Sequence, residues 1–190
     1  MRVGIFHHLG WAVAVTASSD HTVVDRRRIE LIEPGFPSAP IHHEGGPHLL
    51  HRTGEPLDDN ALAILVSDVR ASVMRATAAA FDELAAEVGA PIVSISIRAS
   101  PADFPEEIAA QRRVPYESRA DSVMYCQVLA ELGRRRGWNV SLYDAKSVEA
   151  GAISILGERT DEVLRSPRAT LGPPWSKEHR TALAATIVVT

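Results

Sequence analysis

Residues 2–18, RVGIFHHLGWAVAVTAS, set the direction of the fold. Apolar and β-branched residues fill two short runs, 2–8 and 11–18, around the turn sequence His7-His8-Leu9-Gly10. This pattern predicts two strands joined by a tight turn. A third strand is expected over 21–32, so the chain should begin with an antiparallel meander of three strands.

After the meander the pattern alternates between helices and strands. Apolar residues at intervals of three and four predict a helix from Asp58 or Asp59 to Val88, and Gly89 should end it. Strands are expected over 91–99 and 139–144, and helices over 118–136, from Ser147 to Leu156, and from Lys177 to about Val188. Because a strand that follows a helix implies a crossover, the later strands should pair in parallel. The order β-β-β-α-β-α-β-α predicts an α/β fold with a mixed five-stranded sheet, and it matches the ribonuclease H-like fold.

Composition limits the classes of function. The 190 residues suit one domain, expected over 1–190, and 45% of them are hydrophobic. A net charge of −4 gives no general attraction to DNA, RNA or anionic membranes, so nucleic-acid contacts require a local basic patch. We see no signal peptide and no apolar run near the roughly 20 residues that span a bilayer. The single Cys126 cannot form an internal disulfide, and a cytoplasmic location is the default expectation.

Residues 33–59 are expected to form a long loop, since they contain five prolines and four glycines. The same stretch contains a cluster of candidate metal ligands: His42, His43, Glu44 and His48, with His51 nearby. Neutral imidazole suits transition metals such as Zn²⁺, Ni²⁺ and Cu²⁺. The spacing matches no strong zinc signature, so a mobile loop with incidental histidines is the competing interpretation.

Three stretches resemble RuvC-type Holliday-junction resolvases. Residues 4–15 (GIFHHLGWAVAV) resemble the family's opening strand-turn-strand, 119–154 its second half, and 179–188 (HRTALAATIV) its last helix. The resemblance covers about half of the chain, and it implies a three-layer ribonuclease H-like domain that acts on nucleic acid. It also implies carboxylates that hold two divalent metals, yet Phe6 stands at the first Asp position and His179 at one of the last-helix acids. The strand 94–98 ends in Arg instead of Glu, so ordinary two-Mg²⁺ hydrolysis is not expected.

Imidazole and guanidinium groups are therefore the candidate site residues. If the two ends of the chain meet, His7 or His8 could act with His179 as acid, base or metal ligand. Only one of His7 and His8 can face the site, because neighbouring side chains of a strand point to opposite faces. The competing interpretation is that each is a hydrogen-bonded structural histidine. The expected anion-binding residues are Arg98, Arg119, Lys177 and Arg180. The competing interpretation is that these side chains only keep the surface soluble and form ion pairs with nearby carboxylates.

Three functions follow from these patterns. The first is a protein that handles nucleic acid or a phosphate-bearing ligand through a His/Arg-lined site. The second is a catalytically degenerate protein that binds a partner, and the third is a transition-metal protein that uses the loop from His42 to His51. A divalent metal is compatible with the first and third, no membrane partner is expected, and an exposed edge beside the third strand is compatible with a homodimer.

Overall fold

The computed structural model describes residues 1–47, 54–101 and 103–189. The candidate ligands His48 and His51 therefore lie outside the described residues. The described elements are β1 (Arg2–His7), β2 (Trp11–Ala17), β3 (Val23–Glu30), a π-helical turn η1 (Ile41–Gly45), α1 (Asp59–Val88), β4 (Ser94–Arg98), α2 (Ile108–Gln111), α3 (Glu117–Arg135), β5 (Asn139–Tyr143), α4 (Val148–Leu156), a 3-10 turn η3 (Gly157–Arg159), a second π-helical turn η4 (Asp161–Arg165), α5 (Pro167–Leu171) and α6 (Lys177–Val188).

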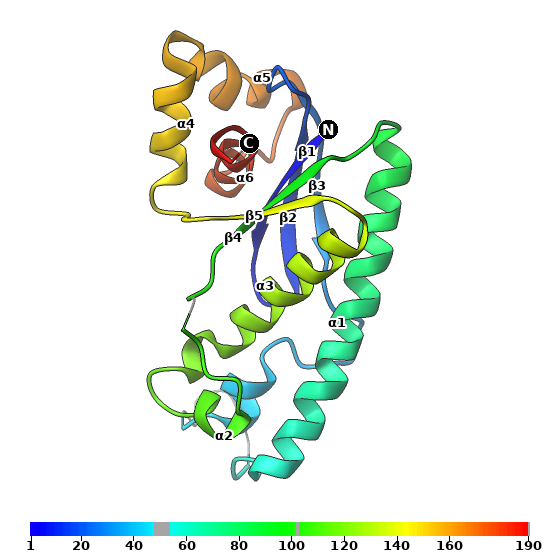
Figure 1. Ribbon diagram of the computed structural model, residues 1–190, viewed down its shortest axis with the longest axis vertical. Coiled ribbons are helices and arrows are strands. Elements are labelled where there is room, and N and C mark those ends of the chain that lie inside the picture. Colours follow the sequence, from blue (N-terminus) through cyan, green and yellow to red (C-terminus); the bar gives the residue numbers. More distant parts are fainter. Residues whose placement is uncertain (48–53, 102, 190) are drawn as a thin grey trace.

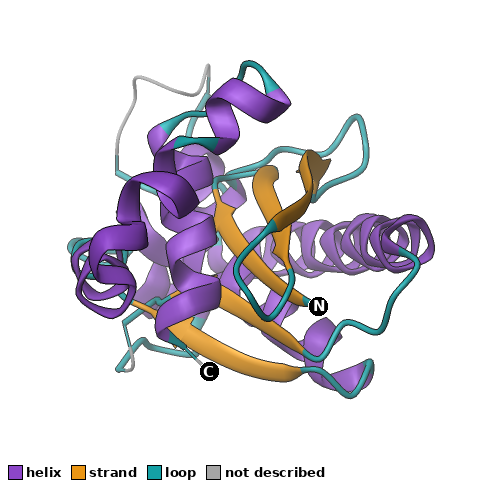
Figure 2. Ribbon diagram, turned by 90° about the horizontal axis from the view of Figure 1, so that it is seen from above, coloured by secondary structure: helices purple, strands orange, loops and turns teal. Residues whose placement is uncertain are grey.

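One five-stranded sheet, in the order β3-β2-β1-β4-β5, forms the middle of the molecule (Figure 2). Strands β1, β2 and β3 pair antiparallel, whereas β4 is parallel to β1 and β5 is parallel to β4. Gly10, with φ of 87°, allows the tight turn between β1 and β2 because it has no side chain to oppose a positive φ. The predicted α/β class and mixed five-stranded sheet are confirmed.

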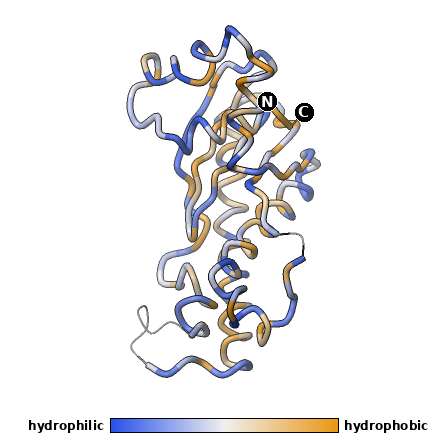
Figure 3. The backbone as a smooth tube through the Cα atoms, turned by 90° about the vertical axis from the view of Figure 1, so that its left-hand side faces the viewer, coloured by the Kyte–Doolittle hydropathy of each residue, from blue (hydrophilic) through white to orange (hydrophobic). Residues whose placement is uncertain are grey.

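Helices cover both faces of the sheet, and each face has its own apolar core. On one face, Val3 and Ile5 pack with residues of α1 and α3. On the other face, Val13 and Val15 pack with residues of α4 and α6. The period-two alternation of the strands thus divides the apolar side chains between two layers. Figure 1 shows α1 on one side of the sheet and α4 with α6 on the other, and the two termini lie at the same end in Figures 1 and 3.

Helix α6 lies unusually close to β1 where they meet at Gly4. A Cβ atom built on Gly4 would lie 1.8 Å from the carbonyl oxygen of Ala182 in α6. Only a residue without a side chain allows this approach. The contact fixes α6 over the central strand, and with it Glu178, which lies one turn before Ala182.

Local signals set the helix ends where the sequence predicts them. Asp58 accepts a hydrogen bond from the backbone N–H of Ala61 (2.8 Å) at the start of α1. Gly89, with φ of 64°, ends α1 in the left-handed conformation. At the start of α6, Ser176 and His179 form a reciprocal capping box. No helix among the described residues is both long enough and apolar enough to cross a membrane.

The expected long loop over 33–59 is only partly a loop, since η1 forms inside it. The carboxylate of Asp121, on α3, accepts hydrogen bonds from the backbone N–H groups of Ile41 and His42, both at 3.0 Å. Arg112 also donates to the carbonyl oxygens of Gly45 (3.0 Å) and Leu57 (2.6 Å). The partners that hold this turn lie far along the chain, which is why no local pattern predicts it.

Candidate functional site

A basic pocket of about 640 Å³ opens at the end of the sheet where the parallel strands β1, β4 and β5 finish. It is lined by His8, Leu9, Arg98, Ala99, Ser100, Pro101, Ser118, Arg119, Ser122, Val123 and Lys146. These residues come from the segments that follow β1, β4 and β5 and from the first half of α3. Parallel strands end at the same edge of a sheet, and ligands of open α/β sheets bind there. The topology therefore brings together residues that are more than 100 positions apart in sequence.

The charge of this pocket is positive. Arg98, Arg119 and Lys146 are cations at neutral pH, and none of the described residues that line the pocket is acidic. The nearby Asp144 is already engaged, because its carboxylate accepts hydrogen bonds from the backbone N–H of Lys146 (3.1 Å) and the hydroxyl of Ser147 (2.8 Å). Arginine offers a planar fork of N–H donors to an oxyanion, and lysine offers a point charge. The lining suits an anion with several oxygen atoms.

Arg98 stands where the resemblance would place metal ligands. Its guanidinium carbon lies 5.0 Å from the centre of the Phe6 ring, in a cation–π contact. Its Nη2 atom donates to the Ser122 hydroxyl at 3.4 Å. Phe6 therefore supports a cation at this edge of the sheet. The residues present offer nitrogen donors and an aromatic face, which do not fit Mg²⁺ because Mg²⁺ requires oxygen ligands.

His8 lines the pocket and is held by groups on two sides. Its Nε2 atom lies 2.9 Å from Oε1 of Glu178, and its ring stacks on Trp11 with centroids 4.1 Å apart. A carboxylate on one ring nitrogen fixes the orientation of an imidazole. Glu178 was missed by the sequence analysis, because its partner is 170 residues away and no motif joins them.

His7 points to the opposite face, as the alternation predicts, and only 1% of its surface is exposed. Its Nε2 atom lies 3.4 Å from Oγ of Ser122. Burial, and next the positive charge of Arg98, lower the pKa of His7 to about 3. His7 is therefore a neutral imidazole at physiological pH.

His179 is not brought to either of these histidines among the described contacts. Its Nδ1 atom accepts a hydrogen bond from the Ser176 hydroxyl (2.8 Å), and its ring lies beside Trp175. It lines a separate groove of about 410 Å³, together with Trp11 and Arg26. Burial, and next the charge of Arg26, lower the pKa of His179. The two ends of the chain do meet, but they meet through His8 and Glu178.

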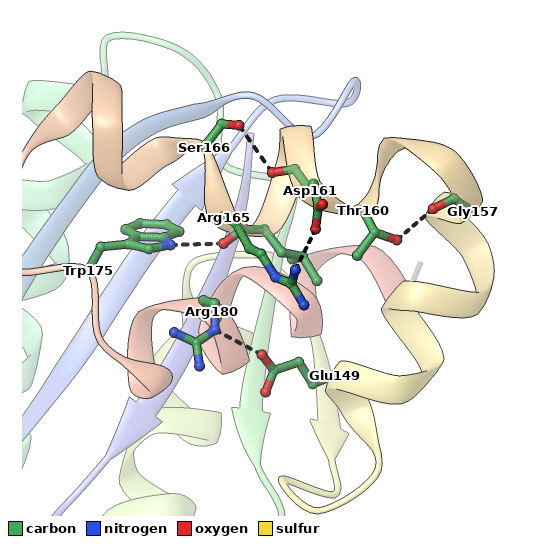
Figure 4. Close-up of polar contacts among 9 residues, drawn as sticks. Glu149, Gly157, Thr160, Asp161, Arg165, Ser166, Trp175 and Arg180 are labelled. Atoms are coloured by element: carbon green, nitrogen blue, oxygen red, sulfur yellow. Dashed lines mark hydrogen bonds and ion pairs between the residues drawn. The ribbon is translucent and has the colours of Figure 1, made fainter.

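The four predicted anion-binding residues separate into two pairs. Arg98 and Arg119 line the basic pocket. Arg180 instead forms an ion pair with Glu149 of α4 (3.0 Å), which Figure 4 shows together with the contacts around η4. Lys177 begins α6 and is not among the described residues that line the basic pocket. The third cation of the basic pocket is Lys146, where the sequence analysis expected Lys177 and Arg180. The signal that could have identified Lys146 is its position two residues after Asp144, at the end of the last predicted strand.

The predicted metal cluster lies in and after η1. His42, His43 and Glu44 belong to η1, which packs beside α3 and α1. The described residues contain no group of three or more His, Cys, Asp or Glu side chains that could hold a metal ion. Because His48 lies outside the described residues, the four-residue cluster as predicted stays a prediction.

Comparisons with known proteins found neither a matching family model nor a matching curated protein. Among solved structures, RuvC of T. thermophilus in complex with a Holliday junction substrate is 12% identical, with a TM-score of 0.48 over 98% of this chain and 90% of that chain. A second structure of Thermus thermophilus RuvC is also 12% identical, with a TM-score of 0.46 over 98% and 91%. Membership of that family stays a prediction.

Proposed function

We propose that this chain is a ribonuclease H-like domain that binds phosphate groups, including those of nucleic acid, in the basic pocket. The observation that carries the proposal is the lining itself: Arg98, Arg119 and Lys146 converge with His8 on one cavity. Strand order supports the fold assignment, since an antiparallel β1-β2-β3 meander continues into parallel β4 and β5. The overall charge of −4 makes this local concentration of cations distinctive.

The same site favours binding over metal-dependent hydrolysis. Two-metal phosphodiester hydrolysis needs carboxylates that hold the ions on either side of the phosphate. Here the aromatic ring of Phe6 lies under Arg98 at the corresponding edge. A guanidinium can stabilise negative charge on a phosphate without a metal, through paired N–H donors.

Salt dependence of single-strand binding tests this proposal. Binding of a fluorescent single-stranded oligonucleotide, measured by anisotropy between 50 and 300 mM KCl, should weaken with salt, with a log–log slope of about −0.7 for each phosphate neutralised in the pocket. Arg98→Ala, Arg119→Ala and Lys146→Ala should each weaken binding and make the slope shallower. Inorganic phosphate, followed by calorimetry, tests the same pocket without a polynucleotide.

Arg134→Ala is the matched control, since Arg134 is exposed on the same helix as Arg119. Fifteen residues separate them, which places them about 22 Å apart along α3. If the three pocket variants bind both ligands as tightly as Arg134→Ala does, the basic pocket is not the phosphate site.

Two further expectations keep their own tests. The transition-metal function rests on His42, His43, Glu44 and His48, and metal content of the untagged protein purified without added metal decides it. A homodimer would use an exposed edge of the sheet, and β3 occupies such an edge. Sedimentation at several protein concentrations decides the oligomeric state.

A further inference from the structure

Two residues that line the basic pocket, Arg98 and Ser122, form a chain of polar side chains with the buried His7. The guanidinium of Arg98 donates from Nη2 to Oγ of Ser122 at 3.4 Å, and Oγ lies 3.4 Å from Nε2 of His7. A guanidinium can only donate hydrogen bonds. The Ser122 oxygen therefore accepts from Arg98, and the Ser122 hydroxyl can donate its own proton to His7 in the tautomer whose Nε2 carries no hydrogen. Ser122 also lines the pocket and is half-buried.

The state of His7 agrees with this direction of donation. Because its pKa is lowered to about 3, the ring is neutral and has one free acceptor nitrogen. Its Nδ1 atom is buried and has no hydrogen-bond partner among the described residues. Both hydrogen-bond partners of the ring in the described part of the chain belong to Ser122, its hydroxyl and its backbone, and an unsatisfied buried nitrogen such as Nδ1 is costly. The polar contacts of this ring are directed at Ser122 alone.

We propose that Ser122 is a nucleophile and His7 its proton acceptor, in a metal-independent attack on a phosphoric ester held in the basic pocket. This inference rests on the proposed function, because Arg98, Arg119 and Lys146 must first hold the phosphate. It adds a covalent step that phosphate binding alone does not require. A serine hydroxyl beside a general base is the usual form of an activated nucleophile.

The step balances as follows. The Oγ–H bond of Ser122 breaks as the proton passes to Nε2 of His7, and a bond forms between Oγ and phosphorus. The bond from phosphorus to the leaving oxygen breaks on the side opposite Oγ, and that oxygen leaves as an alcohol with a proton from solvent water, while His7 holds the proton it accepted. The product is a phosphoric ester of Ser122. Water then attacks phosphorus opposite Oγ and releases a proton to solvent, and Oγ leaves with the proton held by His7, which releases the phosphate and restores the serine hydroxyl.

Charge favours this step only when the ligand is bound. In the free protein, burial first, and next the cation at Arg98, oppose a positive charge on His7. A bound phosphate offsets the charge of Arg98, which makes protonation of His7 easier at the moment of transfer. Arg119 and Lys146 then face the negative charge that grows on the phosphoryl oxygens. The contacts of 3.4 Å are longer than engaged catalytic hydrogen bonds of about 2.6–3.2 Å, as is common before a ligand binds.

A phosphodiester with a coloured leaving group tests the inference. The purified protein is mixed with bis(p-nitrophenyl) phosphate in excess EDTA, and p-nitrophenolate release is followed with stopped flow. The protein is then digested, and the peptide that contains Ser122 is examined by mass spectrometry. We expect a burst of about one p-nitrophenolate per chain and a p-nitrophenyl phosphate adduct on Ser122.

Variants separate the nucleophile from the pocket. Ser122→Ala should abolish the burst and the adduct, while calorimetry shows that it still binds inorganic phosphate. His7→Gln should slow the burst by about 100-fold or more, the range of general-base catalysis. Ser154→Ala is the control, since Ser154 is exposed on α4 and is not among the described residues that line the basic pocket; it should keep the burst.

The outcomes distinguish the two proposals. If wild-type protein binds phosphate but forms no adduct on Ser122, the nucleophile is refuted and the binding function stands. If the adduct forms on another residue, or persists in Ser122→Ala, the nucleophile is also refuted. If inorganic phosphate does not bind and no adduct forms, both proposals fail. The wild-type adduct decides the matter even where His7→Gln does not fold.

Discussion

Replacement of Gly4 by alanine should destabilise the protein severely for so small a change. The added Cβ would lie 1.8 Å from the carbonyl oxygen of Ala182, whereas non-bonded heavy atoms rest about 3.5 Å apart or more. Strand β1 cannot move away, because it pairs with β2 on one side and β4 on the other. Helix α6 must therefore retreat from the sheet by more than about 1 Å.

The size of the loss follows from what α6 buries. Its Leu183 and Ile187 are almost fully buried in the second core, and a gap of 0.5–1 Å already forfeits about a quarter to a half of the dispersion contact. Overpacking of a core costs about 1–3 kcal/mol, and a clash with backbone belongs at the upper end. For a chain of this length, about 3 kcal/mol lowers the midpoint of thermal unfolding by roughly 6–12 °C.

Thermal unfolding followed by circular dichroism measures the change. Gly54→Ala is the control, because no heavy atom of the described residues lies within 4 Å of its added Cβ. Addition of Ala182→Gly should not rescue Gly4→Ala, since the clash is with the carbonyl oxygen and not with the methyl group. A midpoint for Gly4→Ala within 1 °C of the wild type would refute the close packing of α6 on β1.

Three further substitutions test the buried polar groups, each by urea unfolding. Between pH 7 and pH 5, the free energy of unfolding of the wild-type protein should fall by about 2 kcal/mol because of His7. The pKa of His7 in the folded protein, about 3, lies below its value in the unfolded chain, so only the unfolded chain gains a proton in this range. His7→Asn should lack this loss. Asp121 has the opposite sign: burial raises its pKa to about 6, so stability should fall by about 2 kcal/mol as the pH rises from about 4 to 6, and Asp121→Asn should abolish that fall. Tyr143→Phe should cost about 0.5–1.5 kcal/mol, since the Tyr143 hydroxyl donates to the carbonyl oxygen of Ile5 at 2.8 Å in the buried interior; equal stability would show that this bond is dispensable.

Most strands and helices of this fold can be predicted from the sequence, because the residues that define them lie within the elements or at their ends. The strand alternation around residues 3–5 and 13–15 separates two cores, and Asp58, Gly89 and Ser176 mark helix ends. The turn η1 was not predicted, because its cap is the carboxylate of Asp121, 79 and 80 residues away from the groups it binds.

The site was predicted in part for a similar reason. His8, Arg98 and Arg119 could be proposed because strand ends and helix starts identify them, and the pocket brings them together. Ser122 and Glu178 lie inside or at the start of helices with no motif around them, and only tertiary packing gives each its histidine partner. Arg180 is paired with Glu149 on the neighbouring helix, a contact that no sequence pattern indicates, and its anion-binding role stays a prediction.

The contact of Arg98 with Phe6 limits how this protein could change over evolution. An aspartate that arose at position 6 would face the guanidinium and form an ion pair with it, so its oxygens would be engaged before any Mg²⁺ arrived. A glutamate that arose at position 98 would instead sit on an aromatic ring, whose negative face repels it. Each first step is unproductive without the other, so neither single substitution would by itself create a site for Mg²⁺ at this contact.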